Sequence, residues 1–150
     1  MVVDSFRYVQ PSDLDKPLEL HYKVTVRQYA HVAGPLLLVR PRVLGDYAVP
    51  FDDKLRKVPI DLDETGRWHD SYDIALPTGY VVDETPDAVD IDLDFASYHA
   101  SVTAKDNVLH YEVTYVVRRV ELPADRAADF RKFELAILSD EKGTAVLKKE

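Results

Sequence analysis

The sequence predicts a mainly β protein: an antiparallel β-sandwich with one C-terminal α-helix packed on the sheet. Three observations lead to this prediction. Apolar and polar residues alternate with a two-residue period in several short segments, turn-forming residues separate these segments, and a single segment near the C-terminus has the spacing of an amphipathic helix. Extended and helical patterns do not alternate along the chain, so a parallel βαβ sheet is not expected.

Length, charge and composition exclude several classes of protein. The chain has 150 residues, the size of one ordinary domain, and its net charge of −8 repels the phosphate backbone of nucleic acids. It contains no cysteine, which excludes disulfides, thiolate metal sites and cysteine nucleophiles. The longest aliphatic run, residues 36–39, is far shorter than the ~18 residues that span a bilayer. We therefore expect neither a nucleic-acid partner nor membrane insertion.

Residues 1–18 are expected to form an irregular lead-in or linker, because they contain Pro11, Pro17 and several acidic residues. Residues 19–150 are then expected to form a single domain. The alternation predicts strands over residues 20–26, 36–39, about 55–62, 68–76, 80–83, 89–95, 98–104 and 109–117. One acidic residue, Asp70, is an exception, since it falls on the apolar side of its strand.

Loop composition indicates which strands are neighbours. Lys105-Asp106-Asn107 has the composition of a hairpin loop, so segments 98–104 and 109–117 are predicted to pair as adjacent antiparallel strands. After Val117 the apolar residues shift from odd to even positions. A one-residue bulge near Arg118, or a change of the covering face, would produce this shift.

A helix is predicted over about residues 124–140. Pro123 is compatible with the first turn of a helix, where its missing N–H would have no partner. Apolar residues recur at helical spacing on one side of this segment. Three of them, Phe130, Phe133 and Ile137, are therefore expected to be buried against the sheet.

The most conspicuous chemical feature is an acidic ladder. Asp90, Asp92 and Asp94 alternate with apolar residues, so their carboxylates share one face of a strand and are a candidate weak cation site. A calcium-binding loop needs glycine at its sixth position and glutamate at its twelfth. Counted from Asp90, these positions hold Phe95 and Ser101, so the segment does not match such a loop. The alternative interpretation is a solvated strand face, or an edge that its charge keeps from pairing.

The histidines and serines form no catalytic motif. No HExxH, GxSxG or glycine-rich phosphate loop occurs, and Ser71 lies beside His69 and Asp70 on a strand whose successive residues face opposite sides. Four of the five histidines fall on the polar side of predicted strands, which favours exposed side chains over zinc ligands. We therefore expect no catalytic residue and no cofactor.

Aromatic residues on the apolar side of the strands offer a second candidate site. Trp68, Tyr72 and Tyr98 could form a stacking platform for a glycan or a peptide, as in many sandwich binding modules. Packing in the core, with the hydroxyls reaching the rim, explains the same pattern and is favoured, because tyrosine combines an apolar ring with a polar tip.

Several phrases, in order, resemble the C-terminal region of certain bacterial transglutaminase-like proteins. These phrases are residues 76–80 (LPTGY), 83–86 (DETP), 95–98 (FASY), 121–125 (ELPAD) and 146–149 (VLKK). Proteins of this kind carry an N-terminal domain of unknown function, a papain-like transglutaminase core and a β-rich C-terminal domain that ends in a helix. The resemblance covers most of residues 20–149 and is strongest from Trp68 onward.

The resemblance implies one domain of a longer polypeptide, with the Cys-His-Asp residues of the family upstream and a periplasmic or cell-surface setting. No catalytic role carries over, since this chain lacks the cysteine nucleophile. We therefore expect a non-catalytic accessory domain that packs against, or presents substrate to, a transglutaminase-like domain. Its partners would be upstream domains of the same polypeptide. A glycan- or peptide-binding module is the alternative, and a hydrolase built from Asp and His alone is the least favoured function.

Overall fold

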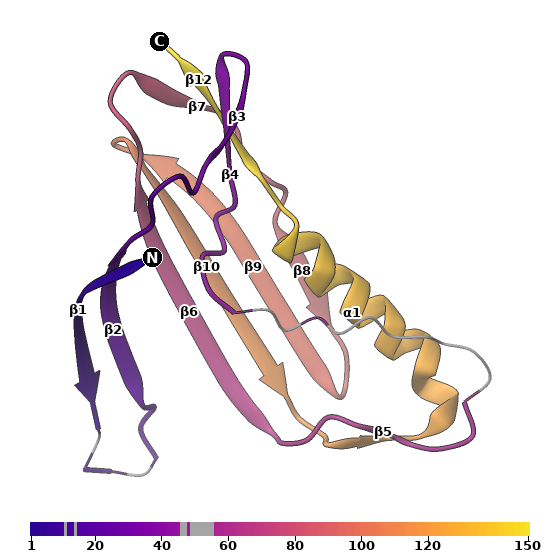
Figure 1. Ribbon diagram of the computed structural model, residues 1–150. Coiled ribbons are helices and arrows are strands. Elements are labelled where there is room, and N and C mark those ends of the chain that lie inside the picture. Colours follow the sequence, from indigo (N-terminus) through magenta and orange to yellow (C-terminus); the bar gives the residue numbers. More distant parts are fainter. Residues whose placement is uncertain (11, 14, 46–47, 49–55) are drawn as a thin grey trace. The chain divides into compact units, whose positions relative to one another are not determined.

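The computed structural model describes residues 1–10, 12–13, 15–45, 48 and 56–150, which form two compact units, Met1–His31 and Val32–Glu150. The first unit is a hairpin in which β1 (Val2–Val9) pairs antiparallel with β2 (Glu19–Thr25) (Figure 1). The expectation of an irregular lead-in is therefore wrong for β1. Its register shifts between Val3 and Ser5, and this irregularity hides the two-residue period in the sequence.

The second unit contains two four-stranded antiparallel sheets. The longer sheet has the order β6-β10-β9-β8, with β6 (Gly66–Ala75), β8 (Val89–Asp92), β9 (Ala96–Lys105) and β10 (Val108–Val117). The shorter sheet has the order β3-β4-β12-β7, with β3 (His31–Ala33), β4 (Leu36–Val39), β7 (Tyr80–Glu84) and β12 (Ala145–Lys149).

A two-stranded ladder joins β5 (Ile60–Asp61) to β11 (Glu121–Leu122). The strand that the sequence predicts over about 55–62 is thus limited to two residues among those described, and residue 55 lies outside the described residues. Ile60 and Leu122 face each other in this ladder and are both buried, so the ladder closes one end of the core.

The predicted pairing of β9 with β10 is confirmed, and it runs without interruption from Lys105 opposite Val108 to Ala96 opposite Val117. Asp106 and Asn107 connect the two strands with φ angles of 48° and 62°. Two successive positive φ angles are the geometry of the type I′ turn, whose twist matches that of the flanking strands.

The shift in apolar positions after Val117 has a simple structural cause. β10 ends at Val117, and the backbone N–H groups of Arg118 and Arg119 donate to the carbonyl oxygen of Phe95 at 2.7 and 3.3 Å. The chain then leaves the longer sheet and Leu122 becomes buried in β11. The end of the strand, with a change of covering partner, accounts for the shift.

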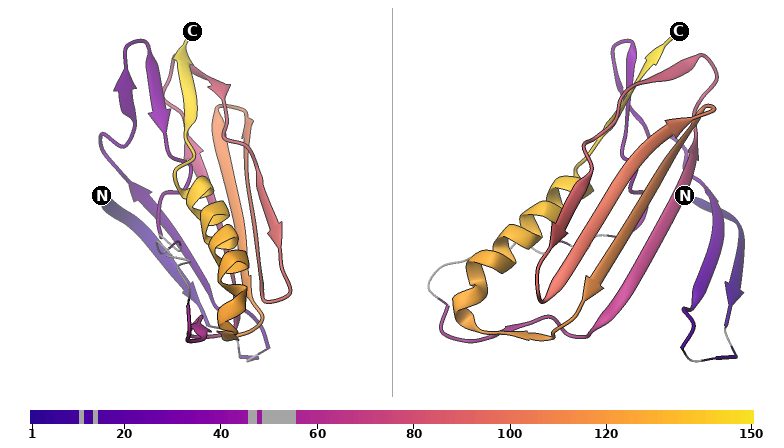
Figure 2. Two further views of the ribbon diagram at one scale, coloured as in Figure 1. Left: turned by 90° about the vertical axis from the view of Figure 1, so that its right-hand side faces the viewer. Right: turned by 180° about the vertical axis from the view of Figure 1, so that it is seen from behind.

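The C-terminal helix packs on one face of the longer sheet (Figure 2). A short 3-10 helix, Ala124–Arg126, leads into α1 (Ala127–Glu141), close to the predicted 124–140. Phe130, Phe133 and Ile137 are 8%, 0% and 0% exposed, so their predicted burial is confirmed. The predicted fold class, mainly β and antiparallel with one C-terminal helix on the sheet, is confirmed as well.

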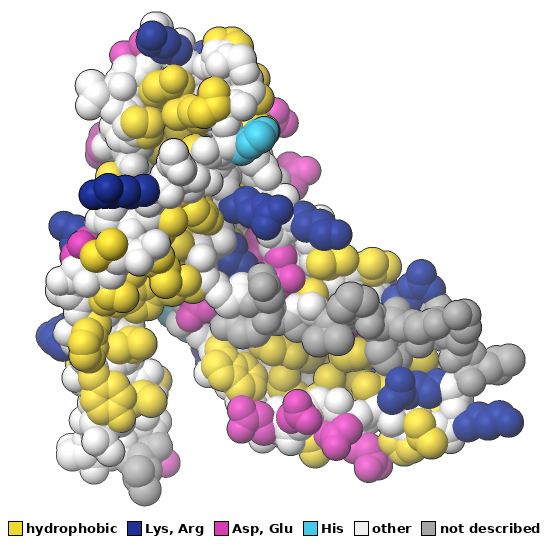
Figure 3. Space-filling view, viewed as in Figure 1, with side chains coloured by type: hydrophobic (Ala, Val, Ile, Leu, Met, Phe, Trp, Pro, Cys, Tyr) yellow, Lys and Arg dark blue, Asp and Glu magenta, His cyan; other side chains and the backbone are white. Residues whose placement is uncertain are grey.

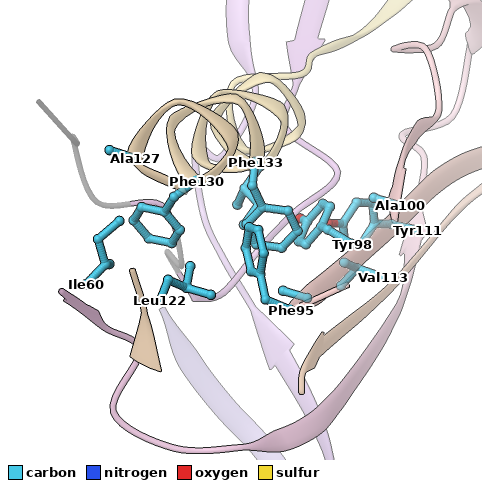
Figure 4. Packing of buried hydrophobic residues seen from close by; sticks show 12 residues of the cluster. Ile60, Phe95, Tyr98, Ala100, Tyr111, Val113, Leu122, Ala127, Phe130 and Phe133 are labelled. Carbon is cyan, nitrogen blue, oxygen red and sulfur yellow. The ribbon is translucent and has the colours of Figure 1, made fainter. Parts of the chain in front are cut away.

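The hydrophobic core lies between α1 and this face, which we call the core face of the longer sheet. Phe130 points from the helix towards Ile60 and Leu122, and Phe133 points towards Phe95 and Tyr98 (Figure 4). The rings of Phe95 and Phe133 meet edge to face, with their centroids 5.8 Å apart. The opposite face of the sheet, the outer face, carries mainly polar side chains, including His69, His99 and His110.

Candidate functional site

Tyr98, one of the three predicted ligand-binding aromatic residues, lies inside the core. Its side chain is fully buried, and its hydroxyl donates a 2.5 Å hydrogen bond to Asp140 Oδ2. The hydroxyl of Tyr111 donates to the same oxygen at 2.6 Å. Since Asp140 lies in the last turn of α1, these two bonds join the helix to β9 and β10.

Arg42 supplies a buried positive charge to the same cluster. Its Nη1 donates to the Tyr98 hydroxyl at 2.9 Å and lies 3.2 Å from Glu141 Oε1 and 3.9 Å from Asp140 Oδ2. The side chains of Arg42, Asp140 and Glu141 are only 3%, 6% and 7% exposed. Glu141 also accepts a hydrogen bond from the N–H of Ala48 at 3.1 Å. These ion pairs and this hydrogen bond therefore hold Arg42 and Ala48 at the C-terminal end of α1.

The environment of the two tyrosines shows what this cluster can do. Burial raises the pKa of Tyr98 and of Tyr111, and the hydrogen bonds to Asp140 raise both values further. The two phenols thus remain protonated donors at neutral pH and stabilise a buried carboxylate. Sequence reasoning missed the cluster, although Asp140 follows Ile137 at helical spacing on the apolar side of the helix, where a polar residue signals a buried partner.

The other two predicted ligand-binding residues, Trp68 and Tyr72, lie on the core face of β6, at the edge of the longer sheet. Both are partly buried. The Trp68 ring stacks on Tyr115, with centroids 5.5 Å apart, and the Tyr72 ring stacks on Tyr111 at 5.8 Å. Trp68, Tyr115 and Tyr98 are cross-strand neighbours in one row, but only the Trp68 end of that row lies at the sheet edge.

The acidic ladder runs along β8, the opposite edge of the sheet, and continues past its end to Asp94. Asp90 pairs with His99 (2.9 Å) and Asp92 with Arg118 (2.9 Å), whereas Asp94 pairs with both Arg126 (2.7 Å) and Arg119 (3.4 Å). The hydrogen bond from Arg126 lowers the pKa of Asp94. Among the residues that the structure describes, no three histidine or carboxylate side chains are arranged to hold a metal ion.

Among the residues that the structure describes, the largest set of exposed apolar side chains lies on the hairpin of β1 and β2. Cross-strand pairing places Val3 opposite Val24, Phe6 opposite Tyr22 and Tyr8 opposite Leu20. These six residues form what we call the apolar hairpin face. Four of them are more than half exposed, namely Val3 (55%), Phe6 (72%), Tyr8 (54%) and Leu20 (58%). Apolar side chains gather over this hairpin on the side shown in Figure 3.

An apolar face with four exposed side chains on a two-stranded hairpin is suited to contact with a partner surface. A two-stranded hairpin is marginally stable in water unless further strands or another surface cover it, and exposed apolar patches mark interaction sites. The other side of the hairpin carries Ser5, Arg7, His21 and Lys23 and suits contact with solvent. The sequence pattern indicated only the β2 half of the apolar face, because the irregular register of β1 concealed the other half.

Comparison with known proteins gives one match. A family model described as "Domain of Unknown Function with solved-structure structure (DUF3858)" matches residues 36–147. No curated protein and no solved structure matches the chain. Within the described part of the chain, no helix has the length and apolar character needed to cross a membrane.

Proposed function

The chain belongs to the DUF3858 family of domains of unknown function. We propose that it is a non-catalytic accessory domain of a larger, bacterial transglutaminase-like protein. In this proposal the apolar hairpin face packs against the catalytic domain. The observation that carries it is the exposure of Phe6, Tyr8 and Leu20 on one side of a hairpin that has only two strands. The ordered phrases from residues 76–80 to 146–149 support the choice of a transglutaminase-like partner.

Packing against a larger domain fits the chemistry of this face. Phe6 and Tyr8 offer large apolar rings, and aromatic residues are enriched where protein surfaces bury each other. Burial of a side chain such as Phe6 contributes about 2 kcal/mol of transfer free energy. The covering surface would therefore stabilise the hairpin and attach the domain in one step.

The complete reading frame that encodes this chain provides the first test. We expect it to encode a cysteine-containing transglutaminase-like domain in the same polypeptide, and a frame without such a domain would show that the proposal is wrong. The second test is amide hydrogen exchange in that longer polypeptide and in the isolated chain. We expect the amides of β1 and β2 to exchange more slowly in the longer polypeptide, because the catalytic domain covers them.

A pair of variants tests the face itself. Phe6→Ser removes an exposed ring from the apolar hairpin face, whereas Arg7→Ser changes the neighbouring residue on the polar side. We expect Phe6→Ser, and not Arg7→Ser, to abolish the extra protection of β1 and β2 in the longer polypeptide. Equal protection in both variants would show that the catalytic domain does not use this face.

A glycan- or peptide-binding module is the second candidate function, and one observation favours it. Trp68 and Tyr72 are only partly buried and lie on the same face of an edge strand, where a ligand can approach from the side. Tyr72→Phe removes only the hydroxyl, which donates to the carbonyl oxygen of Leu44 at 3.4 Å. The test measures binding to a panel of cell-wall glycans and peptides. Weaker binding by Trp68→Phe and Tyr72→Phe, with the melting temperature unchanged, would support this function.

A further inference from the structure

β6 is the longest edge strand of the two four-stranded sheets in the described part of the chain. It has ten residues, whereas the other edge strands, β3, β7 and β8, have three, five and four. Within the residues that the structure describes, β6 pairs with β10 alone, so its other side presents a row of backbone N–H and C=O groups. A long edge of this kind is a template for a further strand. The edge strand β8, in contrast, is short and carries the acidic ladder.

We propose that two copies of this chain associate through β6. The two β6 strands pair antiparallel about a two-fold axis at Ser71, and the longer sheets of both copies join into one continuous sheet. A second copy is the occupant because the side chains of β6 are complementary in charge and polarity to those of a second β6 paired in this register. The inference does not depend on the apolar hairpin face, which lies on different strands.

The two-fold axis determines which residues face each other. When Ser71 faces its own copy, His69 faces Asp73 of the second copy on the outer face, and each imidazole meets a carboxylate. In this arrangement odd-numbered residues face odd-numbered residues and even-numbered residues face even-numbered ones. The core faces of both sheets therefore lie on the same side.

In the same register, the side chains that face each other on the core face are also complementary. Asp70 faces Tyr72 of the second copy, a carboxylate beside a phenol, and Trp68 faces Ile74, an aromatic ring beside a branched aliphatic side chain. By symmetry each of these pairs forms twice. The register also gives a reason for Asp70, the one acidic residue on the apolar side of β6.

The neighbouring registers are less favourable. An axis at Asp70 would place two carboxylates directly opposite each other, and like charges in that position destabilise a strand pair. An axis at Tyr72 would place the carboxylate of Asp70 opposite the apolar side chain of Ile74. Of the three registers, only the axis at Ser71 places both carboxylates of β6 opposite complementary groups without bringing like charges together.

A matched pair of lysine variants tests the proposal. Ser71 and Ser101 are both exposed on the outer face, and both lie opposite Glu112, one on each side of β10. Ser71→Lys places two like charges at the proposed axis, whereas Ser101→Lys places the same charge in the interior of the sheet. By sedimentation velocity we expect a concentration-dependent dimer of the unmodified chain and of Ser101→Lys, and about fivefold weaker association or more for Ser71→Lys.

Cross-linking tests the register directly, since the chain has no cysteine of its own. Under mild oxidation we expect Ser71→Cys to form a disulfide-linked dimer, because residues facing each other across the axis come within disulfide range, and Ser101→Cys to remain uncrosslinked. Unchanged circular dichroism in all four variants shows that the fold is kept. A chain that stays monomeric up to about 1 mM, or equal cross-linking at positions 71 and 101, would overturn the proposal.

Discussion

The hydroxyl of Tyr111, in the middle of the longer sheet, donates a 2.6 Å hydrogen bond to the carboxylate of Asp140 in the last turn of the helix. The same carboxylate accepts the hydroxyl of Tyr98, and Arg42 lies 3.9 Å away. A buried carboxylate is stable only when hydrogen bonds and an opposite charge compensate its lost hydration. The packing of helix on sheet therefore depends on a polar cluster as well as on the aromatic core.

Replacing Asp140 by asparagine tests the contribution of this cluster. The variant keeps the shape of the side chain but removes the charge that faces Arg42 and weakens the acceptor for two phenols. We expect the free energy of unfolding, measured by urea denaturation, to fall by about 2–3 kcal/mol. Asp129→Asn is the control, because Asp129 is exposed and pairs with Arg126 on the surface, and its cost should stay below about 1 kcal/mol. Equal stability of both variants would contradict this account.

The same tyrosines predict how stability depends on alkaline pH. Burial, with the hydrogen bonds to Asp140, raises the pKa of Tyr98 and Tyr111 above the ordinary value of 10.0. Above that pH the unfolded chain releases phenolic protons that the folded chain retains, so the stabilisation is complete below pH 10.0 and is lost as the pH rises. For two such groups the free energy of unfolding should fall by about 3 kcal/mol per pH unit.

A tyrosine variant separates this effect from other alkaline titrations. Tyr111→Phe removes one of the two buried phenols, so we expect about half of the slope above pH 10 in urea denaturation at a series of pH values. An unchanged slope in Tyr111→Phe would show that its phenol is not the titrating group.

Local features of the fold could be predicted from the sequence, because each is encoded within a few residues. The pairing of β9 with β10 follows from two alternating segments and a short loop, and the burial of Phe133 follows from helical spacing. The strand β1 could not be predicted in this way, since its register shift breaks the period between Val3 and Ser5. The two-residue alternation of apolar and polar residues indicates a strand only where the strand has no register shift.

The candidate site shows a second limit of the sequence. The alternation of apolar and polar residues predicts which face of a sheet a residue occupies. It assigns Trp68 and Tyr98 to the same face correctly. It does not give the order of the strands, and that order places Trp68 on an edge strand while Tyr98 is buried beneath the helix. No periodicity connects Arg42 to Asp140 either, because their contact forms only when distant segments meet.

Gly66 is predicted to be required for the position of the single tryptophan. A Cβ atom at residue 66 would lie 2.7 Å from Cη2 of the Trp68 ring, so Gly66→Ala must displace the indole. We expect a loss of about 1 kcal/mol in stability and a change in tryptophan fluorescence. Gly34→Ala is the control: its φ of +62° makes alanine unfavourable, but no atom lies within 4 Å of the added carbon. A fluorescence change in Gly34→Ala as large as that in Gly66→Ala would contradict the prediction.

Asn107 combines two roles in the hairpin turn that a pair of substitutions can separate. Its φ of 62° is a left-handed conformation, which asparagine and glycine adopt more readily than alanine, and its Nδ2 donates to the carbonyl oxygen of Leu76 at 3.1 Å. Asn107→Gly keeps the conformation and loses only the hydrogen bond, so we expect a cost of about 1 kcal/mol. Asn107→Ala loses both and should cost about 2 kcal/mol or more, since a non-glycine residue forced into this conformation adds about 1 kcal/mol. Urea denaturation measures the difference between the two variants. If glycine and alanine cost the same, the hydrogen bond to Leu76 alone, and not the type I′ geometry, determines which residue this turn accepts.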